Sequence, residues 1–166
     1  MGREQFDKFI SIILKDLSAS EKLLREEPEL IHATNDIGET VFHFLVVENN
    51  LEEVEWLFNK GAKVNTVNDF GNTPLSEAAG LGKKEMCQFL IKKGANHKIR
   101  DENGDTALSQ AATSDEVAVV NLLLDLIKPE EQLTDYFTSI TYDFLLDKES
   151  LSAKAMSDRG LHWPTA

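Results

Sequence analysis

Few side chains in this 166-residue sequence have the spacing that acid–base, nucleophilic or metal chemistry requires. No two of its four histidines show the i, i+4 spacing with which a helix presents a pair of zinc ligands. These histidines are His32, His43, His97 and His162. The single cysteine, Cys87, stands beside Met86 and Phe89 on the apolar side of an expected helix, so we expect a buried and unreactive thiol. The sequence therefore nominates no catalytic residue, no metal site and no cofactor.

Two short patterns imitate ligand-binding motifs but lack the remaining parts of those motifs. Asp69-Phe70-Gly71 spells the magnesium-binding tripeptide of protein kinases, yet the chain has neither their glycine-rich phosphate loop nor their His-Arg-Asp loop. Asp101, Asn103 and Asp105 alternate as in a calcium loop, but Ala112 stands where the bidentate glutamate belongs. We interpret both patterns as polar turns, because both lie in turns that recur at a fixed interval.

The composition is that of an acidic protein. Lys and Arg number 17 against 29 Asp and Glu, which gives a formal net charge of -12. This charge repels nucleic-acid phosphates and anionic lipids, and no apolar run approaches the roughly 20 residues that a membrane span needs. A lone cysteine cannot form an internal disulfide, and charged residues interrupt the N-terminal segment where a secretory signal would be apolar. We therefore expect a cytoplasmic protein with no nucleic-acid or membrane partner.

A repeat of 33 residues dominates the sequence. Gly38, Gly71 and Gly104 are 33 residues apart, and each is followed two positions later by a threonine. Each glycine belongs to a polar turn, each threonine opens an apolar run, and a second apolar run at helical spacing follows. The three threonines are Thr40, Thr73 and Thr106. This pattern predicts one turn and two helices in each repeat.

The repeat resembles the ankyrin repeat, whose signature is a turn, Gly-x-Thr-Pro-Leu-His, Ala-Ala and then Gly-Ala. The best match is residues 71–76, Ala78-Ala79 and Gly94-Ala95. The resemblance implies an all-α, ankyrin-repeat solenoid of stacked helix-loop-helix units with projecting β-hairpin-like loops. His43 matches the signature histidine, so the resemblance implies that it hydrogen-bonds loop backbone near a helix start.

We expect a single domain, residues 1–166, that consists of five parts. Repeats are predicted at residues 35–67, 68–100 and 101–128, between an N-terminal capping repeat (1–34) and C-terminal capping helices with a tail (129–166). Helices are predicted at residues 5–16, 19–26, 39–48, 51–59, 73–80, 84–92, 106–112, 116–127, 130–146 and 149–157. In the first repeat Leu45 and Val46 replace the two signature alanines, so we expect the packing there to differ.

Ankyrin stacks bind proteins with their loop tips and with the exposed, concave face of their first helices, and the resemblance implies this role for the matching positions here. On the loops these positions are Asp36, Ile37, Glu39, Asp69, Phe70, Asn72, Glu102, Asn103 and Asp105. On the first helices they are Phe44, Val47, Glu48, Glu77, Leu81, Gln110 and Ser114. Ile37 and Phe70 either anchor a partner or pack on neighbouring loops, and the sequence leaves both interpretations open.

Charge is unevenly distributed along the repeats. Residues 35–68 carry six acidic and two basic side chains, residues 69–100 carry three and six, and residues 101–133 carry eight and one. The loop tips are acidic, and we expect them to steer a basic partner into place. The basic excess lies away from the tips and offers an alternative binding surface: Lys83, Lys84, Lys92, Lys93, Lys98 and Arg100. A second alternative is an acidic surface that serves solubility alone.

The predicted function is non-enzymatic binding of another protein with a basic surface by a module that is monomeric when free. Some bacterial immunity proteins are built from ankyrin repeats, so neutralisation of a toxin is one form of this hypothesis. A general adaptor or scaffold and a host-directed effector are the alternatives. An enzyme that uses the C-terminal segment is a rival hypothesis from another class of function. The polar side chains of that segment are Tyr136, Tyr142, Asp143 and His162, and their spacing does not indicate a reaction.

Overall fold

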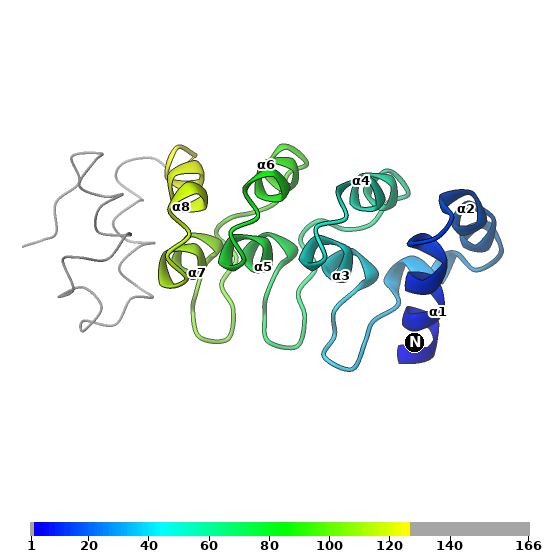
Figure 1. The fold of residues 1–166 in the computed structure, drawn as a ribbon. Coiled ribbons are helices and arrows are strands. Elements are labelled where there is room, and N and C mark those ends of the chain that lie inside the picture. Colours follow the sequence, from blue (N-terminus) through cyan, green and yellow to red (C-terminus); the bar gives the residue numbers. More distant parts are fainter. Residues whose placement is uncertain (1, 127–166) are drawn as a thin grey trace, which may run out of the picture.

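The computed structural model describes residues 2–126, which form a row of helices (Figure 1). In chain order these are α1 (Arg3–Ile13), α2 (Leu17–Glu26), the 3₁₀-helix η1 (Pro28–His32), α3 (Val41–Val47), α4 (Leu51–Asn59), α5 (Pro74–Gly80), α6 (Lys84–Lys92), α7 (Ala107–Thr113) and α8 (Val117–Leu124). This part of the chain contains no β-strand, only an isolated bridge between Thr34 and Thr40. The predicted all-α solenoid is confirmed. The helices expected at 130–146 and 149–157 lie outside the described residues.

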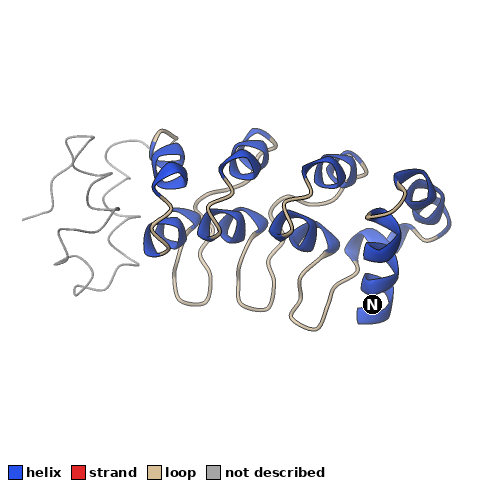
Figure 2. Ribbon diagram, viewed as in Figure 1, coloured by secondary structure: helices blue, strands red, loops and turns tan. Residues whose placement is uncertain are grey.

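The helices stack in pairs, one pair to each repeat. α3 is followed by α4, α5 by α6, and α7 by α8. First helices pack on first helices, α3 on α5 and α5 on α7, and the second helices α6 and α8 also pack together. The connections that lead into the first helices project from one side of the stack (Figure 2). We call them loop 1 (residues 34–40), loop 2 (67–73) and loop 3 (100–106).

Each first helix begins just after the repeated threonine because that residue caps it. The threonine Oγ1 accepts a hydrogen bond from the N–H three residues on, at 3.4, 3.1 and 3.3 Å in the three repeats. In return, His43 Nδ1, Ser76 Oγ and Ser109 Oγ accept from the threonine N–H at 3.3, 2.9 and 2.7 Å. This reciprocal capping satisfies backbone donors that a first helical turn leaves unpaired. The helices consequently start one or two residues later than predicted.

The core runs along the stack and its packing differs between repeats. Ala78 and Ala79 of α5 are fully buried, as are the equivalent Ala111 and Ala112 of α7, and α5 packs more extensively on α7 than on α3. In α3 the same positions hold Leu45 and Val46, which are also fully buried. Larger side chains hold neighbouring helices further apart. The replacement of the signature alanines in α3 therefore accompanies the difference in packing that we expected.

Residues 2–33 form a helical end without the repeat signature. Phe6, Phe9 and Ile13 of α1 are buried, and α1 packs against α2, η1 and α3. The N-terminus of α1 lies at the level of the loops (Figure 1). Asp16 separates α1 from α2, because its carboxylate accepts hydrogen bonds from the N–H groups of Ser18 and Ala19 and caps α2. Helix α1 therefore ends three residues before the predicted position, and η1 was not predicted.

Candidate functional site

Loops 1, 2 and 3 share one backbone structure, which a polar residue and a glycine create. Asn35, Asn68 and Asp101 each accept hydrogen bonds at Oδ1 from the N–H groups two and four residues on, at 2.8 to 3.1 Å. The glycine three residues further has a φ of 73°, 80° or 86°, a left-handed conformation that glycine adopts without strain. These two residues fix the loop, so the residues at its tip are free to vary.

Adjacent loops are joined by one backbone hydrogen bond each. The N–H of Asp69 donates to the carbonyl of Ile37 at 3.0 Å, and the N–H of Glu102 donates to the carbonyl of Phe70 at 3.0 Å. Residues 33 apart therefore stand side by side along the row of loops. We call the surface formed by the three loops and the exposed side of α3, α5 and α7 the loop face.

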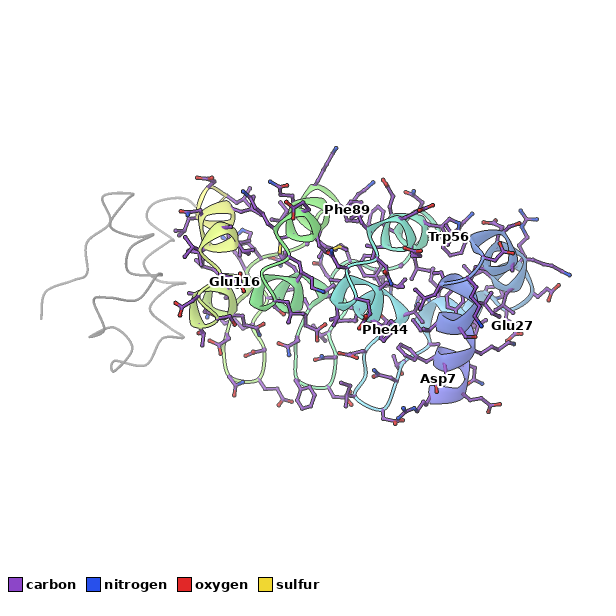
Figure 3. The ribbon with its side chains drawn as sticks, viewed as in Figure 1. Asp7, Glu27, Phe44, Trp56, Phe89 and Glu116 are labelled. Carbon is purple, nitrogen blue, oxygen red and sulfur yellow. The ribbon has the colours of Figure 1, made fainter. Side chains whose placement is uncertain are left out.

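Four large apolar side chains are exposed in loops 1 and 2 or at the end of α5. Ile37, Val67, Phe70 and Leu81 have exposed fractions of 40%, 50%, 50% and 52%. Ile37 and Phe70 occupy the same position in successive loops, and Leu81 caps the C-terminus of α5. Phe44 of α3 differs, because its half-buried ring meets Phe6 of α1 edge-on with the ring centroids 6.0 Å apart (Figure 3). Phe44 thus has a partner inside the protein.

The acidic side chains of the loop face fall into two groups. Asp36, Asp69 and Glu102, at the loop tips, are exposed, and Asp36 forms an ion pair with Arg3 of α1. Glu39 and Asp105 lie closer to the helices and are half-buried. Glu48 and Asn103 are exposed as well. The tips therefore present negative charge to solvent.

Glu77 of α5 and Gln110 of α7, which occupy equivalent positions, form hydrogen bonds with loop residues. Gln110 Nε2 donates to Asn72 Oδ1 at 2.7 Å and to Asp101 Oδ2 at 2.9 Å. Glu77 accepts from Asn68 Nδ2 at 2.9 Å. Burial raises the pKa of Glu77 to about 8, and the charge and hydrogen bonding of Glu39 add to the rise. Asn72, Glu77 and Gln110 therefore connect loops to helices within the protein.

The basic side chains of the alternative surface are partly occupied by internal contacts. Lys93 Nζ lies 3.4 Å from the Glu55 carboxylate and 5.2 Å from the ring centroids of Phe58 and Phe89. Lys83 Nζ donates a hydrogen bond to the backbone carbonyl of Val47. Figure 3 shows Phe89 on a second helix, on the opposite side of the stack from the loops.

His43 and Cys87 have the structural roles that we expected. The His43 ring is fully buried, and its Nε2 donates to the carbonyl of Asn72 at 3.2 Å while Nδ1 accepts from the N–H of Thr40. Burial lowers the pKa of His43 to about 4, so the ring is neutral. Cys87 is fully buried, and burial raises the pKa of its thiol to about 12. Neither group is poised for reaction at neutral pH.

Residues 2–126 contain neither a metal-binding cluster of side chains nor a membrane-spanning helix. Within this range no three His, Cys, Asp or Glu side chains are grouped so that they could hold a metal ion. None of the helices in the same range combines the length and the apolar character that crossing a bilayer would require.

Sequence reasoning did not nominate two sets of residues that shape this surface. Asn35, Asn68 and Asp101 hold the loops, and their 33-residue spacing is a signal that could have identified them. Arg3 and Phe6 bring α1 against loop 1 and α3. Residues 1–34 contain no repeated pattern that would predict those contacts.

Comparison with known proteins identifies the repeat. A family profile described as ankyrin repeats (3 copies) matches residues 10–101 and also residues 42–135. Together the two matches span well over half of the chain. No curated protein matches the chain significantly.

Proposed function

Since the chain belongs to the ankyrin-repeat family, we propose that it is a non-enzymatic module that binds a folded, basic protein through the loop face. The family membership indicates a protein–protein interaction module. The side chains of loops 1 to 3 support the choice of this surface and of a basic partner. The choice of surface depends above all on Phe70, which is half-exposed at the tip of the central loop.

The surroundings of Phe70 have the composition of a binding centre. Ile37 lies beside it on loop 1, and the carboxylates of Asp69 and Glu102 flank it. An aromatic anchor surrounded by polar groups is typical of the residues that contribute most to protein–protein affinity. Exposed carboxylates attract a partner of opposite charge and raise the association rate. Because the loop backbone is already fixed by its own hydrogen bonds, little ordering is needed on binding.

The alternative basic surface is less well supported. Lys83 and Lys93 would have to leave the Val47 carbonyl and the Glu55 carboxylate before they could bind a partner. Lys93 would also leave two aromatic rings. The carboxylates of Asp69 and Glu102 have no such internal partners within residues 2–126.

Several biological roles agree with this function. Neutralisation of a basic toxin by an immunity protein is one, because acidic loops could cover a site that binds nucleic-acid phosphates. An adaptor or scaffold and a host-directed effector would use the same surface with other partners. The proposal includes a monomeric free protein in the cytoplasm. The rival enzyme hypothesis concerns residues outside the described part of the chain.

Affinity capture from the native cell with two matched variants tests the surface. Phe70→Ala removes an apolar side chain from the loop face, and Leu51→Ala removes one of similar exposure, 41%, from the start of α4. We expect Phe70→Ala to weaken the captured complex about 30-fold, or about 2 kcal/mol, mainly through faster dissociation. Leu51→Ala should leave the affinity unchanged. Equal affinities for both variants would show that Phe70 is not an anchor.

Charge variants of the same complex test the acidic tips. Asp69→Asn, Glu102→Gln and Asp105→Asn together should slow association several-fold and reduce its sensitivity to salt. The matched control removes three exposed or half-buried carboxylates from the second helices: Glu52→Gln, Glu53→Gln and Glu85→Gln. If both loop variants bind normally while charge reversal at Lys84 and Lys92 abolishes binding, the basic surface is the working one.

A further inference from the structure

The three repeats place different side chains in one network between loops and first helices. At the second junction, between loops 2 and 3, the Gln110 amide donates to Asn72 of the preceding loop and to Asp101 of its own loop. At the first junction, between loops 1 and 2, the equivalent residues are Glu77, Glu39 and Asn68, each 33 positions earlier. Two carboxyl groups thus meet where the second junction has two amides.

The first junction has no hydrogen-bond donor between Glu39 and Glu77 unless one of these two carboxyl groups is protonated. Glu39 Oε2 accepts from Asn35 Nδ2 at 2.7 Å, and Glu77 Oε1 accepts from Asn68 Nδ2 at 2.9 Å. Glu77 Oε2 is buried and has no hydrogen-bond donor among the described residues. Glu39 holds the place of Asn72 in the second junction, where Gln110 Nε2 and Asn72 Oδ1 lie 2.7 Å apart, and a side-chain hydrogen bond with Glu39 contributes to the raised pKa of Glu77. Because ionised carboxylates only accept hydrogen bonds, this contact is a bond only when one of the two groups is protonated.

No cation replaces that proton within residues 2–126. Neither Glu39 nor Glu77 forms an ion pair with any lysine, arginine or histidine of this range. The elements packed against α5 carry other titratable groups, and none of them forms a hydrogen bond or an ion pair with the Glu77 carboxyl group. These groups are His43 on α3, Glu48 just after α3, Lys84, Glu85, Cys87 and Lys92 on α6, Lys83 at the start of α6, and Arg100, Asp101, Glu102 and Asp105 of loop 3.

We infer that Glu39 and Glu77 share one proton at neutral pH and that its loss weakens the connection between loops 1 and 2, which makes the loop face sensitive to pH. In the protonated state Glu77 donates to Glu39 the bond that Gln110 donates to Asn72. In the deprotonated state two adjacent carboxylates repel each other, and the loop face carries one more negative charge. The consequence for binding rests on the proposed function, whereas the shared proton does not.

The pH range follows from the pKa of Glu77. Burial, with the contribution of Glu39, raises this pKa from 4.5 to about 8 in the folded protein. The folded state therefore holds a proton that the unfolded state releases between these values, so the stabilising contribution is fully present below pH 4.5 and is lost as the pH rises to 8. His43 acts in the opposite direction around and below pH 6.5, so it offsets the Glu77 effect by only about twofold over the interval from pH 6.5 to 8.

Urea denaturation of the free, full-length protein between pH 6.5 and 8 tests the inference. We expect the unfolding equilibrium constant of the parent protein to rise about 8-fold over this interval, because the proton that Glu77 releases on unfolding raises it about 15-fold and His43 offsets this about twofold. Glu77→Gln, which copies Gln110, should remove this dependence and raise stability at pH 8. Glu48→Gln, which removes an exposed carboxylate just after α3, should retain the parental dependence.

Carbon-13 NMR titration of the glutamate carboxyl groups provides an independent measurement. The Glu77 signal should titrate near pH 8 in the parent protein and at lower pH in Glu39→Gln, since that variant removes the neighbouring negative charge. The inference is wrong if Glu77 titrates near pH 4.5, or if Glu77→Gln shows the same loss of stability as the parent. Neither experiment uses a partner, so failure of the proposed binding function would leave this result unaffected.

Discussion

The first junction and the second junction have the same backbone geometry but different side-chain chemistry. In both, an Asn or Asp side chain and a glycine shape the loop, and one backbone bond joins it to the next. The first junction contains Glu39, Glu77 and His43, whereas the second contains Asn72, Gln110 and Ser76. The first junction thus holds a carboxyl group whose pKa burial raises to about 8, and the second holds an amide in its place.

The histidine adds a contact that the serine does not supply. His43 Nε2 reaches from α3 to the Asn72 carbonyl of loop 2. Among the described residues, Ser76 Oγ bonds only to the backbone of Thr73, at the start of its own helix. Conversely, α5 and α7, which both carry a buried Ala-Ala pair, pack more extensively than α3 and α5. A repeat can therefore keep its backbone structure while it exchanges extensive helix packing for polar contacts.

The two junctions should differ most in the stability that is lost when the loop glycines are replaced by alanine. All three have positive φ, but a methyl group on Gly71 would meet backbone of loop 3, with Asp101 Cα at 2.9 Å. On Gly38 it would meet chiefly the Asp69 side chain, and on Gly104 it would meet no atom within 4 Å. We expect losses of about 3 kcal/mol for Gly71→Ala, about 2 for Gly38→Ala and about 1 for Gly104→Ala. Urea denaturation measures the ranking, and three equal losses would show that only φ matters.

Replacement of His43, the histidine of the first junction, should have an intermediate effect on stability. Because burial lowers the pKa of His43 to about 4 while an unfolded histidine titrates at 6.5, the contribution of the neutral ring is present above pH 6.5 and lost as the pH falls towards 4. We expect His43→Ser, which copies Ser76, to abolish a loss of about 2 kcal/mol between pH 6.5 and 5. Denaturation in a Glu77→Gln background keeps the opposing titration of Glu77 out of the measurement. An unchanged slope in His43→Ser would contradict this role.

The fold was predictable because its signals are local and repeated. The loop glycines and capping threonines recur every 33 residues, and each has a physical role that depends only on its own turn or helix start. Helix bounds moved by a few residues where a side chain such as Asp16 caps the backbone earlier than hydrophobic spacing suggests. The N-terminal helix was predicted, but its contacts with Phe44 and Asp36 were not, because they join unrelated sequences.

The binding surface was predictable in position but not in the role of each residue. Family resemblance nominated Glu39, Glu77 and Gln110 as partner-binding residues, and the structure places Glu77 and Gln110 in contacts within the protein. That distinction depends on which side chains meet across a junction. The sequence does contain a clue, since 33-residue spacing aligns Glu77 with Gln110 and Glu39 with Asn72.

We expect the smallest change in stability from a substitution that makes the second junction resemble the first. Gln110→Glu removes the amide that donates to Asn72 and Asp101, and it places a carboxyl group beside the Asp101 carboxylate. We expect a loss of about 1 to 2 kcal/mol at pH 8, because a net hydrogen bond is worth about 1 kcal/mol and the new charge is repelled. The loss should be smaller at pH 6, where the new carboxyl group can bind a proton and donate in place of the amide.

Two controls decide whether the charge or the lost amide causes that effect. Gln110→Met keeps the length of the side chain without adding a titratable group, so its loss of stability should be the same at pH 6 and pH 8. The double variant Gln110→Glu with Asp101→Asn supplies an amide in place of the repelling carboxylate, as Asn68 does for Glu77, and should recover part of the stability at pH 8. If Gln110→Glu is equally stable at both pH values, a carboxyl group in this network does not bind a proton near neutrality. The raised pKa of Glu77 would then depend on features of the first junction that Gln110→Glu does not reproduce in the second.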